Sequence, residues 1–142
     1  MDAVVDDVGL HTWYRCPVCG ASLLDHTEFY LADDACRECG ANLWCWRQEH
    51  EGNVILVPIP QRTPATADVE SLVRALRRSG KVGRVEVDMS ELEVVSSSLV
   101  AELVILHRRI REAGGGLLLF GLNPYVRASL HRFRLDRVFE IV

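Results

Sequence analysis

The chain has 142 residues, of which 49% are hydrophobic and 25% are charged, a composition that excludes a wholly disordered protein. The densest apolar run, Leu99 to Leu106, is interrupted by Glu102 and is too short to form a membrane-spanning helix. The first ten residues hold three aspartates and no basic residue, unlike a secretory signal. We therefore expect a soluble, cytoplasmic protein with no membrane insertion.

The net charge of −4 is unevenly distributed along the chain. Residues 1–60 hold ten acidic and three basic side chains, whereas residues 61–142 hold thirteen basic and ten acidic ones. This change in composition indicates a boundary between two parts of the chain. Because nucleic acids are bound mainly by clustered Lys and Arg, we do not expect the acidic N-terminal part to bind nucleic acid.

Four of the five cysteines lie in two similar motifs, CPVCG and CRECG, which together have the pattern C-x2-C-x16-C-x2-C. The pattern is typical of a structural zinc site, because each tight turn presents two thiolates to the same ion. A glycine follows each pair, where the chain must reverse and a positive φ angle is easiest. The predicted zinc ligands are Cys16, Cys19, Cys36 and Cys39.

Disulfides are the competing interpretation, but paired CxxC motifs in a chain without a predicted secretory signal favour a metal. Iron is an alternative to zinc, since four tetrahedral sulfurs suit either ion. Four thiolates leave no open coordination position, so we predict a structural metal rather than a catalytic one. We expect a zinc ribbon over residues 1–41, with His11 and His26 at its surface rather than among the ligands.

The fifth cysteine, Cys45, lies in the strand-like segment LWCWRQ, and we expect it to be a small buried hydrophobic residue. Aromatic residues also cluster in and beside the ribbon. We expect them to pack in the core or between the two parts, because aromatic side chains bury large areas. Stacking on nucleic-acid bases is the alternative. These aromatic residues are Trp13, Tyr14, Phe29, Tyr30, Trp44 and Trp46.

The next segments predict a hairpin and a helix. Residues 43–48 and 53–60 read as two strands on either side of a tight turn. The segment ADVESLVRALRRSG, residues 67–80, has apolar residues at helical spacing and is closed by Gly80, with Asp68 as the expected N-cap. A valine-rich strand is then predicted over residues 82–89.

The remaining segments continue the alternation. A run of three serines begins a helix that is expected to reach Glu112 and to end in the glycines that follow Ala113. Residues 117–122 predict a buried strand, and Asn123 and Pro124 form the cap and first residue of a last helix. The final core contacts are expected from Leu135, Val138 and Phe139.

This order of strands and helices predicts the α/β class, with a mixed, largely parallel sheet covered by helices. The chain contains neither G-x-G-x-x-G nor a P-loop, so dinucleotide and ordinary ATP chemistry gain no support. His107 and His131 each lie beside arginines in a predicted helix, without a facing nucleophile. We interpret both regions as solvated basic surface and do not expect an enzyme.

The C-terminal part closely resembles the STAS domain of bacterial anti-sigma-factor antagonists. The resemblance rests on a strand that ends in Asp88-Met89-Ser90, the serines before a long helix, the segment GGGLLLFGLNPYVRASL and the closing LDRVF. It covers roughly residues 42–142, and the zinc ribbon looks like an N-terminal addition. The resemblance implies a STAS-like fold over residues 42–142, without catalysis. It also implies a protein partner, an anti-sigma factor with serine kinase activity, and a separate phosphatase.

In these antagonists a motif written D-S-S-G-L-G or D-S/T-x-G begins the helix, and its first Ser or Thr is phosphorylated by the partner kinase. The matching stretch here is SSSLVA, which places Ser97 at the phosphorylated position. Ser96 replaces the Asp of the family, and Leu99 and Ala101 replace its glycines. The resemblance therefore implies phosphorylation at Ser97 and partner contacts from Ser96, Ser98 and Leu99.

A serine at the start of a helix also has a purely structural role, because its side chain caps the first turn. Capping by Ser96 or Ser97 without phosphorylation would leave a constitutive STAS scaffold. A ligand-responsive STAS module is a second interpretation, and a ribbon that binds nucleic acid or the transcription machinery is a third. Our main hypothesis is a bacterial signal-transduction protein that regulates transcription by binding a protein partner through the surface around Ser97.

Overall fold

The computed structural model describes residues 15–22, 35–78 and 80–142. These residues form a five-stranded sheet in which the order of the strands in space is their order in the chain, β1-β2-β3-β4-β5. The strands are β1 (Cys45–His50), β2 (Asn53–Pro58), β3 (Arg84–Asp88), β4 (Gly116–Phe120) and β5 (Glu140–Ile141). The helices are α3 (Thr66–Arg77), α4 (Ser97–Glu112), α5 (Pro124–Arg132) and the short 3-10 helix η2 (Leu135–Arg137).

The pairing of the strands confirms the predicted mixed sheet. β1 and β2 are antiparallel, whereas β2 with β3, β3 with β4 and β4 with β5 are parallel. Glu51 and Gly52 join the antiparallel pair, and both have positive φ angles, 51° and 81°. Positive φ at both central residues suits the right-handed twist of a two-residue hairpin. The predicted turn is therefore confirmed.

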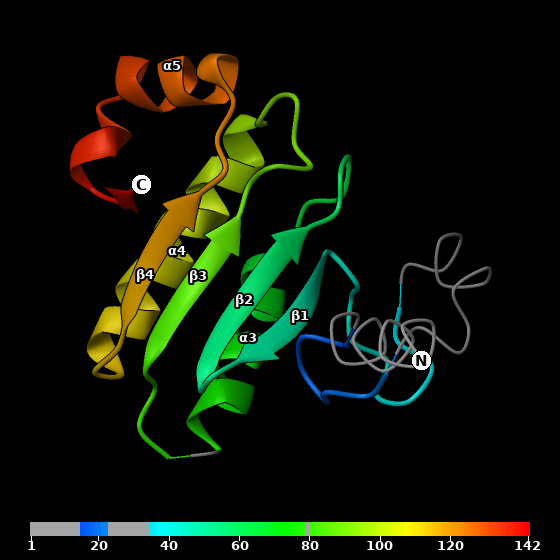
Figure 1. The fold of residues 1–142 in the computed structure, drawn as a ribbon. Helices are drawn as coiled ribbons and strands as arrows, with labels where there is room; N and C mark the ends of the chain where they lie inside the picture. Colours follow the sequence, from blue (N-terminus) through cyan, green and yellow to red (C-terminus); the bar gives the residue numbers. More distant parts are fainter. Residues whose placement is uncertain (1–14, 23–34, 79) are drawn as a thin grey trace, which may run out of the picture.

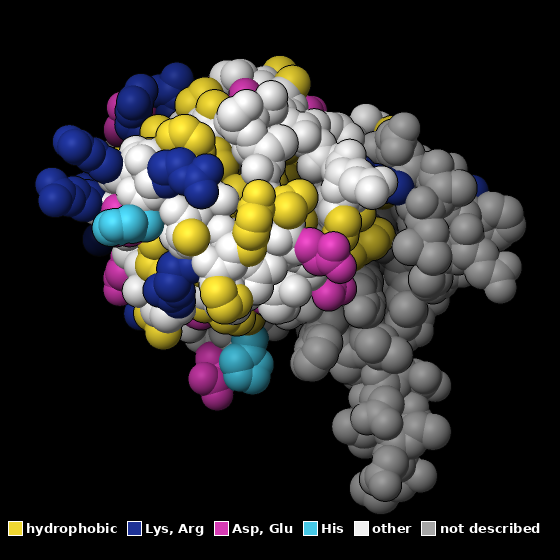
Figure 2. Space-filling model, turned by 90° about the horizontal axis from the view of Figure 1, so that it is seen from above, with side chains coloured by type: hydrophobic (Ala, Val, Ile, Leu, Met, Phe, Trp, Pro, Cys, Tyr) yellow, Lys and Arg dark blue, Asp and Glu magenta, His cyan; other side chains and the backbone are white. Residues whose placement is uncertain are grey.

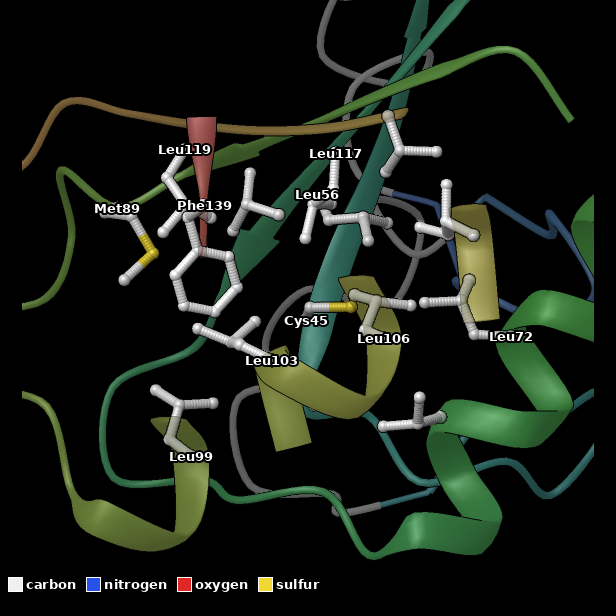
Figure 3. Packing of buried hydrophobic residues seen from close by; sticks show 14 of the residues in the cluster. Cys45, Leu56, Leu72, Met89, Leu99, Leu103, Leu106, Leu117, Leu119 and Phe139 are labelled. Carbon is white, nitrogen blue, oxygen red and sulfur yellow. The ribbon is translucent and has the colours of Figure 1, made fainter. Parts of the chain in front are cut away.

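Two helices cover one face of the sheet. Figure 1 shows α3 and α4 side by side behind the strands, and α5 beyond the upper end of β4. The side chains of Leu99, Leu103 and Leu106 point from α4 toward the sheet residues and Phe139 (Figure 3). Leu106 and Leu119 are fully buried. Burial of each such leucine stabilises the fold by about 2 kcal/mol, which fixes α4 against the sheet.

The helix starts confirm one predicted cap and correct another. Asn123 caps α5 as expected, because its side-chain oxygen accepts a hydrogen bond from the Val126 amide at 2.7 Å. Asp68 is not the N-cap of α3, since the helix begins earlier, at Thr66, and Ala65 holds the cap position. The Asp68 carboxylate instead reaches back and accepts from the Ala65 amide at 2.7 Å.

The C-terminal segment closes the core with two of the three expected residues. Phe139 is 3% exposed and Leu135 packs against the main apolar cluster. The prediction for Val138 is wrong, since its side chain is 39% exposed. The 3-10 turn of η2 rotates Val138 outward while its neighbour Phe139 enters the core. Among the described residues, no helix is long and apolar enough to cross a membrane.

Candidate functional site

The four predicted ligands lie in two turns built in the same way. In the first turn, the Gly20 amide donates to the carbonyl oxygen of Cys16 at 3.0 Å. In the second, the Gly40 amide donates to the carbonyl oxygen of Cys36 at 2.8 Å. Gly20 and Gly40 have φ angles of 76° and 78°, a region that glycine adopts without strain. The repeated CxxCG motif thus produces two matching turns.

The turns bring four sulfur atoms together, all within 4.8 Å of one another. The Sγ atoms of Cys16 and Cys39 are 3.7 Å apart, and those of Cys19 and Cys36 are 3.8 Å apart. Four ligands at about 2.3 Å from a tetrahedral metal are separated by about 3.8 Å, so the cluster fits one such ion. All four cysteines are free, and a disulfide would need the sulfurs to be about 2 Å apart.

Backbone amides surround the sulfurs with hydrogen-bond donors. The amides of Val18, Ala21 and Glu38 donate to the Sγ atoms of Cys16, Cys19 and Cys36, each at 3.4 Å. Such donors favour the thiolate form that a metal requires. Burial acts in the opposite direction and raises the pKa of the Cys16 thiol. A bound cation would offset this burial effect, so the donor set fits a metal better than four neutral thiols.

Cys45 does not belong to this cluster. It is fully buried in the main core beside Leu56 and Leu106, and burial raises the pKa of its thiol well above the ordinary value. Figure 3 shows its sulfur among these leucines. The interpretation of Cys45 as a small buried hydrophobic residue is confirmed.

The first turn is attached to the edge strand β1. The backbones of Arg15 and Arg47 exchange two hydrogen bonds, of 3.1 and 2.8 Å. Arg47 is 8% exposed, and its Nη1 donates to the carbonyl oxygen of Pro17 at 3.2 Å. Arg47 also pairs with Glu49 at 3.2 Å. A buried guanidinium therefore connects the cysteine turn to the sheet.

The second turn is attached to α3. The Asn42 side chain donates to the Asp68 carboxylate at 2.9 Å, the same oxygen that accepts from the Ala65 amide. Leu43 is fully buried and packs with Cys16 and Cys36 in a small apolar cluster that Trp46 also contacts. Both cysteine turns therefore contact the sheet-and-helix part of the molecule.

Two of the six aromatic residues lie in the described residues, and both pack as expected. Trp44 is 1% exposed in the main core, whereas Trp46 packs against the small cluster around Cys16. Trp44 contributes buried apolar area and is not available to stack on a base, and Trp46 is partly buried. The others lie outside the described residues, as do the two histidines expected at the ribbon surface: Trp13, Tyr14, Phe29, Tyr30, His11 and His26.

The serine run divides its roles between neighbouring residues. Ser96 is the N-cap of α4, and its Oγ accepts a hydrogen bond from the Leu99 amide at 3.0 Å. Ser97 and Ser98 are the first two residues of the helix and are both exposed. Capping is thus performed by Ser96 and not by Ser97.

Leu99 is buried and does not lie on the surface, where a residue that contacts a partner is expected. Its side chain is 4% exposed and points into the core with Leu103 (Figure 3). Position 99 falls on the face of α4 that packs on the sheet, so an apolar residue there is buried rather than presented. The burial of Leu99 therefore argues against a direct partner contact by this side chain, whereas Ser98 is accessible.

The exposed serines lie at the end of the sheet where β2, β3 and β4 finish (Figure 1). Asn123 fixes two loops at this end, because its Nδ2 donates to the carbonyl oxygens of Leu92 and Glu93 at 3.2 and 3.1 Å. Val94 follows in the first of these loops and is 62% exposed, and Tyr125 lies in the first turn of α5 and is 64% exposed. We call this end of the sheet, seen from above in Figure 2, the serine edge.

The two histidines singled out in the sequence have different surroundings. His107 is half-buried and packs edge-on against Phe139, with ring centroids 5.7 Å apart. Burial, with a smaller contribution from Arg111, lowers the pKa of His107. His131 is exposed, and its Nδ1 lies 2.7 Å from the Asp136 carboxylate, which lowers the pKa of Asp136. Each histidine has a structural contact that accounts for its position.

The arginines of α4 are exposed, as predicted, and one of them also bridges two helices. Arg109 lies 2.7 Å from Glu70 of α3 and 3.1 Å from Glu112. This exposed bridge joins the two helices that cover the sheet. Its side chains lie partly in solvent, so the bridge contributes little to stability.

The comparison with known proteins identifies the fold. Three solved structures are similar: a Thermotoga maritima protein assigned as an anti-sigma factor antagonist, an anti-sigma-factor antagonist (STAS) domain protein from Planctomyces limnophilus, and an anti-sigma factor antagonist from Mycobacterium paratuberculosis. They are 20%, 18% and 16% identical, with TM-scores of 0.53, 0.51 and 0.55. The aligned regions span 67%, 68% and 68% of this chain. In the same order, they span 82%, 87% and 82% of the three solved chains.

At these identities the likeness shows a shared fold. No protein of curated function is significantly similar to the sequence. The family model described as "Mlab, STAS domain" matches residues 64–142, which is more than half of the 142 residues. The matched residues contain β3, β4, β5 and all of the described helices. The chain therefore belongs to the STAS domain family.

Proposed function

We propose that this protein is a non-enzymatic interaction module of the anti-sigma-factor-antagonist type, which binds a regulatory protein at the serine edge and is switched by phosphorylation of Ser97. The observation that supports the proposal is the division of roles between two serines. Ser96 supplies the helix cap. Ser97 is exposed, and its hydroxyl makes no hydrogen bond within the described residues, so it has no structural task that phosphorylation would disturb.

The start of α4 would stabilise a phosphate on Ser97. The first amides of a helix lack partners inside the helix, and the positive end of its dipole favours an anion. A phosphate adds nearly two negative charges. The serine edge already carries exposed Glu91 and Glu93, so the added charge would repel a partner whose contacting surface is acidic.

The solved structures of similar fold support a protein as the partner, since they are named as anti-sigma factor antagonists. The proposed partner is an anti-sigma factor with serine kinase activity. The chain is then the substrate of the kinase, and a phosphatase resets the switch. Such partner switching places the protein in bacterial signal transduction and transcription regulation, in the cytoplasm.

We also propose that residues 1–41 form a zinc ribbon with a structural role and that residues 42–142 form the STAS domain. Cys16, Cys19, Cys36 and Cys39 would hold the Zn²⁺, which cross-links the two turns and neutralises their thiolates. The support is the sulfur geometry, together with the contacts of the turns to Arg47 and Asp68. The ribbon would thereby hold the strand that enters the sheet.

The experiment that tests the switch is recovery of the tagged protein from its native cells, with partners and phosphorylation sites identified by mass spectrometry. We expect a kinase-like anti-sigma factor, and phosphate on Ser97. Ser97→Ala should keep this partner and lose the phosphate, whereas Ser97→Glu should lose the partner. The matched control is Ser98→Ala, which changes the adjacent exposed serine and should behave as the wild type.

A different result would contradict the proposal. An unmodified Ser97 with stable partners that are indifferent to Ser97→Glu would mean a constitutive scaffold. In that case the serines serve only to begin the helix.

A further inference from the structure

An open apolar groove runs along α4 and continues to the end of α5. It has a volume of about 500 Å³. Ala101, Val104 and Ile105 line one side, Phe133 and Leu135 line the other, and Ser97 lies at one end. From Ser97 to Ile105 the groove follows α4 for about 12 Å, or roughly two helical turns. We call it the α4–α5 groove.

Phe133 is a large, exposed apolar residue of this groove. Its side chain is 63% exposed although it lies at the C-cap of α5, next to the buried Leu130. Exposed aromatic area beside other apolar side chains is unfavourable in water, and contiguous apolar patches commonly mark sites of protein contact. Aromatic side chains are also the residues that most often dominate binding energy at such sites.

Three exposed arginines lie close in the chain to groove-lining residues and indicate the charge of the occupant. Arg108 follows Val104 by one turn on the same face of α4, and Arg132 and Arg134 stand on either side of Phe133 in the chain. None of the three makes an ion pair with another described residue, in contrast to Arg109. Figure 2 shows Lys and Arg side chains gathered around hydrophobic ones on the side opposite the grey residues.

The net charge of residues 97–142, which contain the groove, has the same sign as the three arginines. Residues 97–142 contain seven arginines and four acidic residues, whereas residues 1–60 contain three basic and ten acidic residues. An acidic segment would therefore be attracted to the groove side of the molecule, and a basic segment repelled.

We propose that the α4–α5 groove binds an acidic amphipathic helix of the partner protein. The apolar side chains of that helix, spaced at i, i+3, i+4 and i+7, would lie against Val104 and Phe133. Its Asp and Glu residues would face the three arginines. The proposal rests on the proposed function, because Ser97 lines one end of the groove. A phosphate on Ser97 would then repel the acidic helix directly.

The test selects peptides without knowledge of the natural partner. A displayed library of random 16-residue peptides is selected on the full, metal-loaded chain. Bound peptides are then measured by fluorescence anisotropy against wild-type protein and variants. We expect the enriched peptides to have helical apolar spacing and an excess of Asp and Glu. Phe133→Ala should weaken their binding at least about tenfold, as expected for an aromatic residue that dominates an interface.

Two further variants form a matched pair. Ala101 and Ala128 are both exposed helical alanines, but only Ala101 lines the groove. Ala101→Glu should abolish binding of the selected peptides by filling the groove with a negative charge. Ala128→Glu should leave their affinity within about twofold of wild type, within the range of ordinary surface substitutions. Far-ultraviolet circular dichroism checks that both variants fold.

Some outcomes would overturn the inference. Enriched peptides that are basic, or that bind Ala101→Glu as well as wild type, would show that the groove does not select an acidic helix. Absence of enriched peptides would do the same. Concentration-dependent dimers lost in Ala101→Glu would make a second copy of the chain the occupant. If the partner from native cells binds Ala101→Glu normally but not Ser97→Glu, the groove inference fails and the proposed function survives.

Discussion

The Arg47 guanidinium in β1 donates a hydrogen bond to the Pro17 carbonyl oxygen, 3.2 Å away in the first cysteine turn. Arg47 is the one buried charged side chain among the described residues, and a buried charge is stable only while its partners hold it. The backbone of the same residue pairs with Arg15. The cysteine turn is therefore part of the environment that makes the edge of the sheet stable.

The first prediction concerns the metal. Cys16→Ser removes one of four ligands and should reduce bound zinc from about one ion per chain to almost none, since three thiolates bind far more weakly. Cys45→Ala is the matched control, because it also removes a buried thiol but lies outside the cluster. It should keep the full zinc content. Elemental analysis of the purified proteins measures both, and retention of zinc in Cys16→Ser would refute the four-cysteine assignment.

The second prediction separates the two serines by stability. Ser96→Ala removes the side chain that accepts from the Leu99 amide, so the free energy of unfolding should fall by about 1 kcal/mol. Ser97→Ala removes no such contact and should change it by less than about 0.5 kcal/mol. Urea unfolding followed by circular dichroism measures both variants. Equal losses would mean that Ser97 shares the capping role.

The third prediction concerns the turn that leads into β4. A Cβ atom on Gly115 would lie 2.4 Å from the carbonyl oxygen of Gly83, which is too close for any real contact. Gly115→Ala should therefore destabilise the protein by about 1–3 kcal/mol. A Cβ on the adjacent Gly116 meets open space, so Gly116→Ala should change stability by less than about 0.5 kcal/mol. Similar midpoints of urea unfolding for the two variants would contradict this packing.

The fourth prediction is a dependence of stability on pH. Burial lowers the pKa of His107 below its ordinary value of 6.5, so the unfolded chain binds a proton more readily than the folded one. The contribution of His107 to stability is thus fully present above about pH 6.5 and is lost as the pH falls toward its folded pKa. Comparison of urea midpoints at pH 7.5 and pH 5.5 should show this loss.

Two histidine variants test the assignment of that pH effect. His107→Asn should reduce the difference between the two urea midpoints, because it removes the group that titrates. His50→Asn changes an exposed histidine and should keep the wild-type difference. A wild-type difference in His107→Asn would assign the effect to other groups.

Much of the sheet and of the four-cysteine cluster follows from short patterns in the sequence. The repeated CxxCG motif fixes both the turn geometry and the ligand spacing, so four sulfurs within 4.8 Å could be expected from the letters alone. Asn123 with Pro124 likewise predicts a helix start correctly. In each case neighbouring residues specify the local backbone, and the repetition of the motif indicates that the two cysteine turns share one site.

Features that depend on distant packing were not predictable in the same way. Leu99 follows two exposed serines, and only its contact with the sheet shows that it is buried. Arg47 reads as an ordinary strand residue, yet its side chain is buried against Pro17, which lies thirty positions earlier. The α4–α5 groove is formed by segments that no local motif brings together.

The strand order of the sheet has a consequence for how the chain assembles. Each strand pairs with the strand that precedes it in the chain, so the hydrogen-bonding partner of every new strand has already been synthesised when that strand leaves the ribosome. The hairpin of β1 and β2, with its two-residue turn, is the most local pairing and provides the first template. The first cysteine turn precedes this hairpin in the chain and pairs through Arg15 with Arg47, so part of the open edge of β1 is covered by a segment synthesised before it.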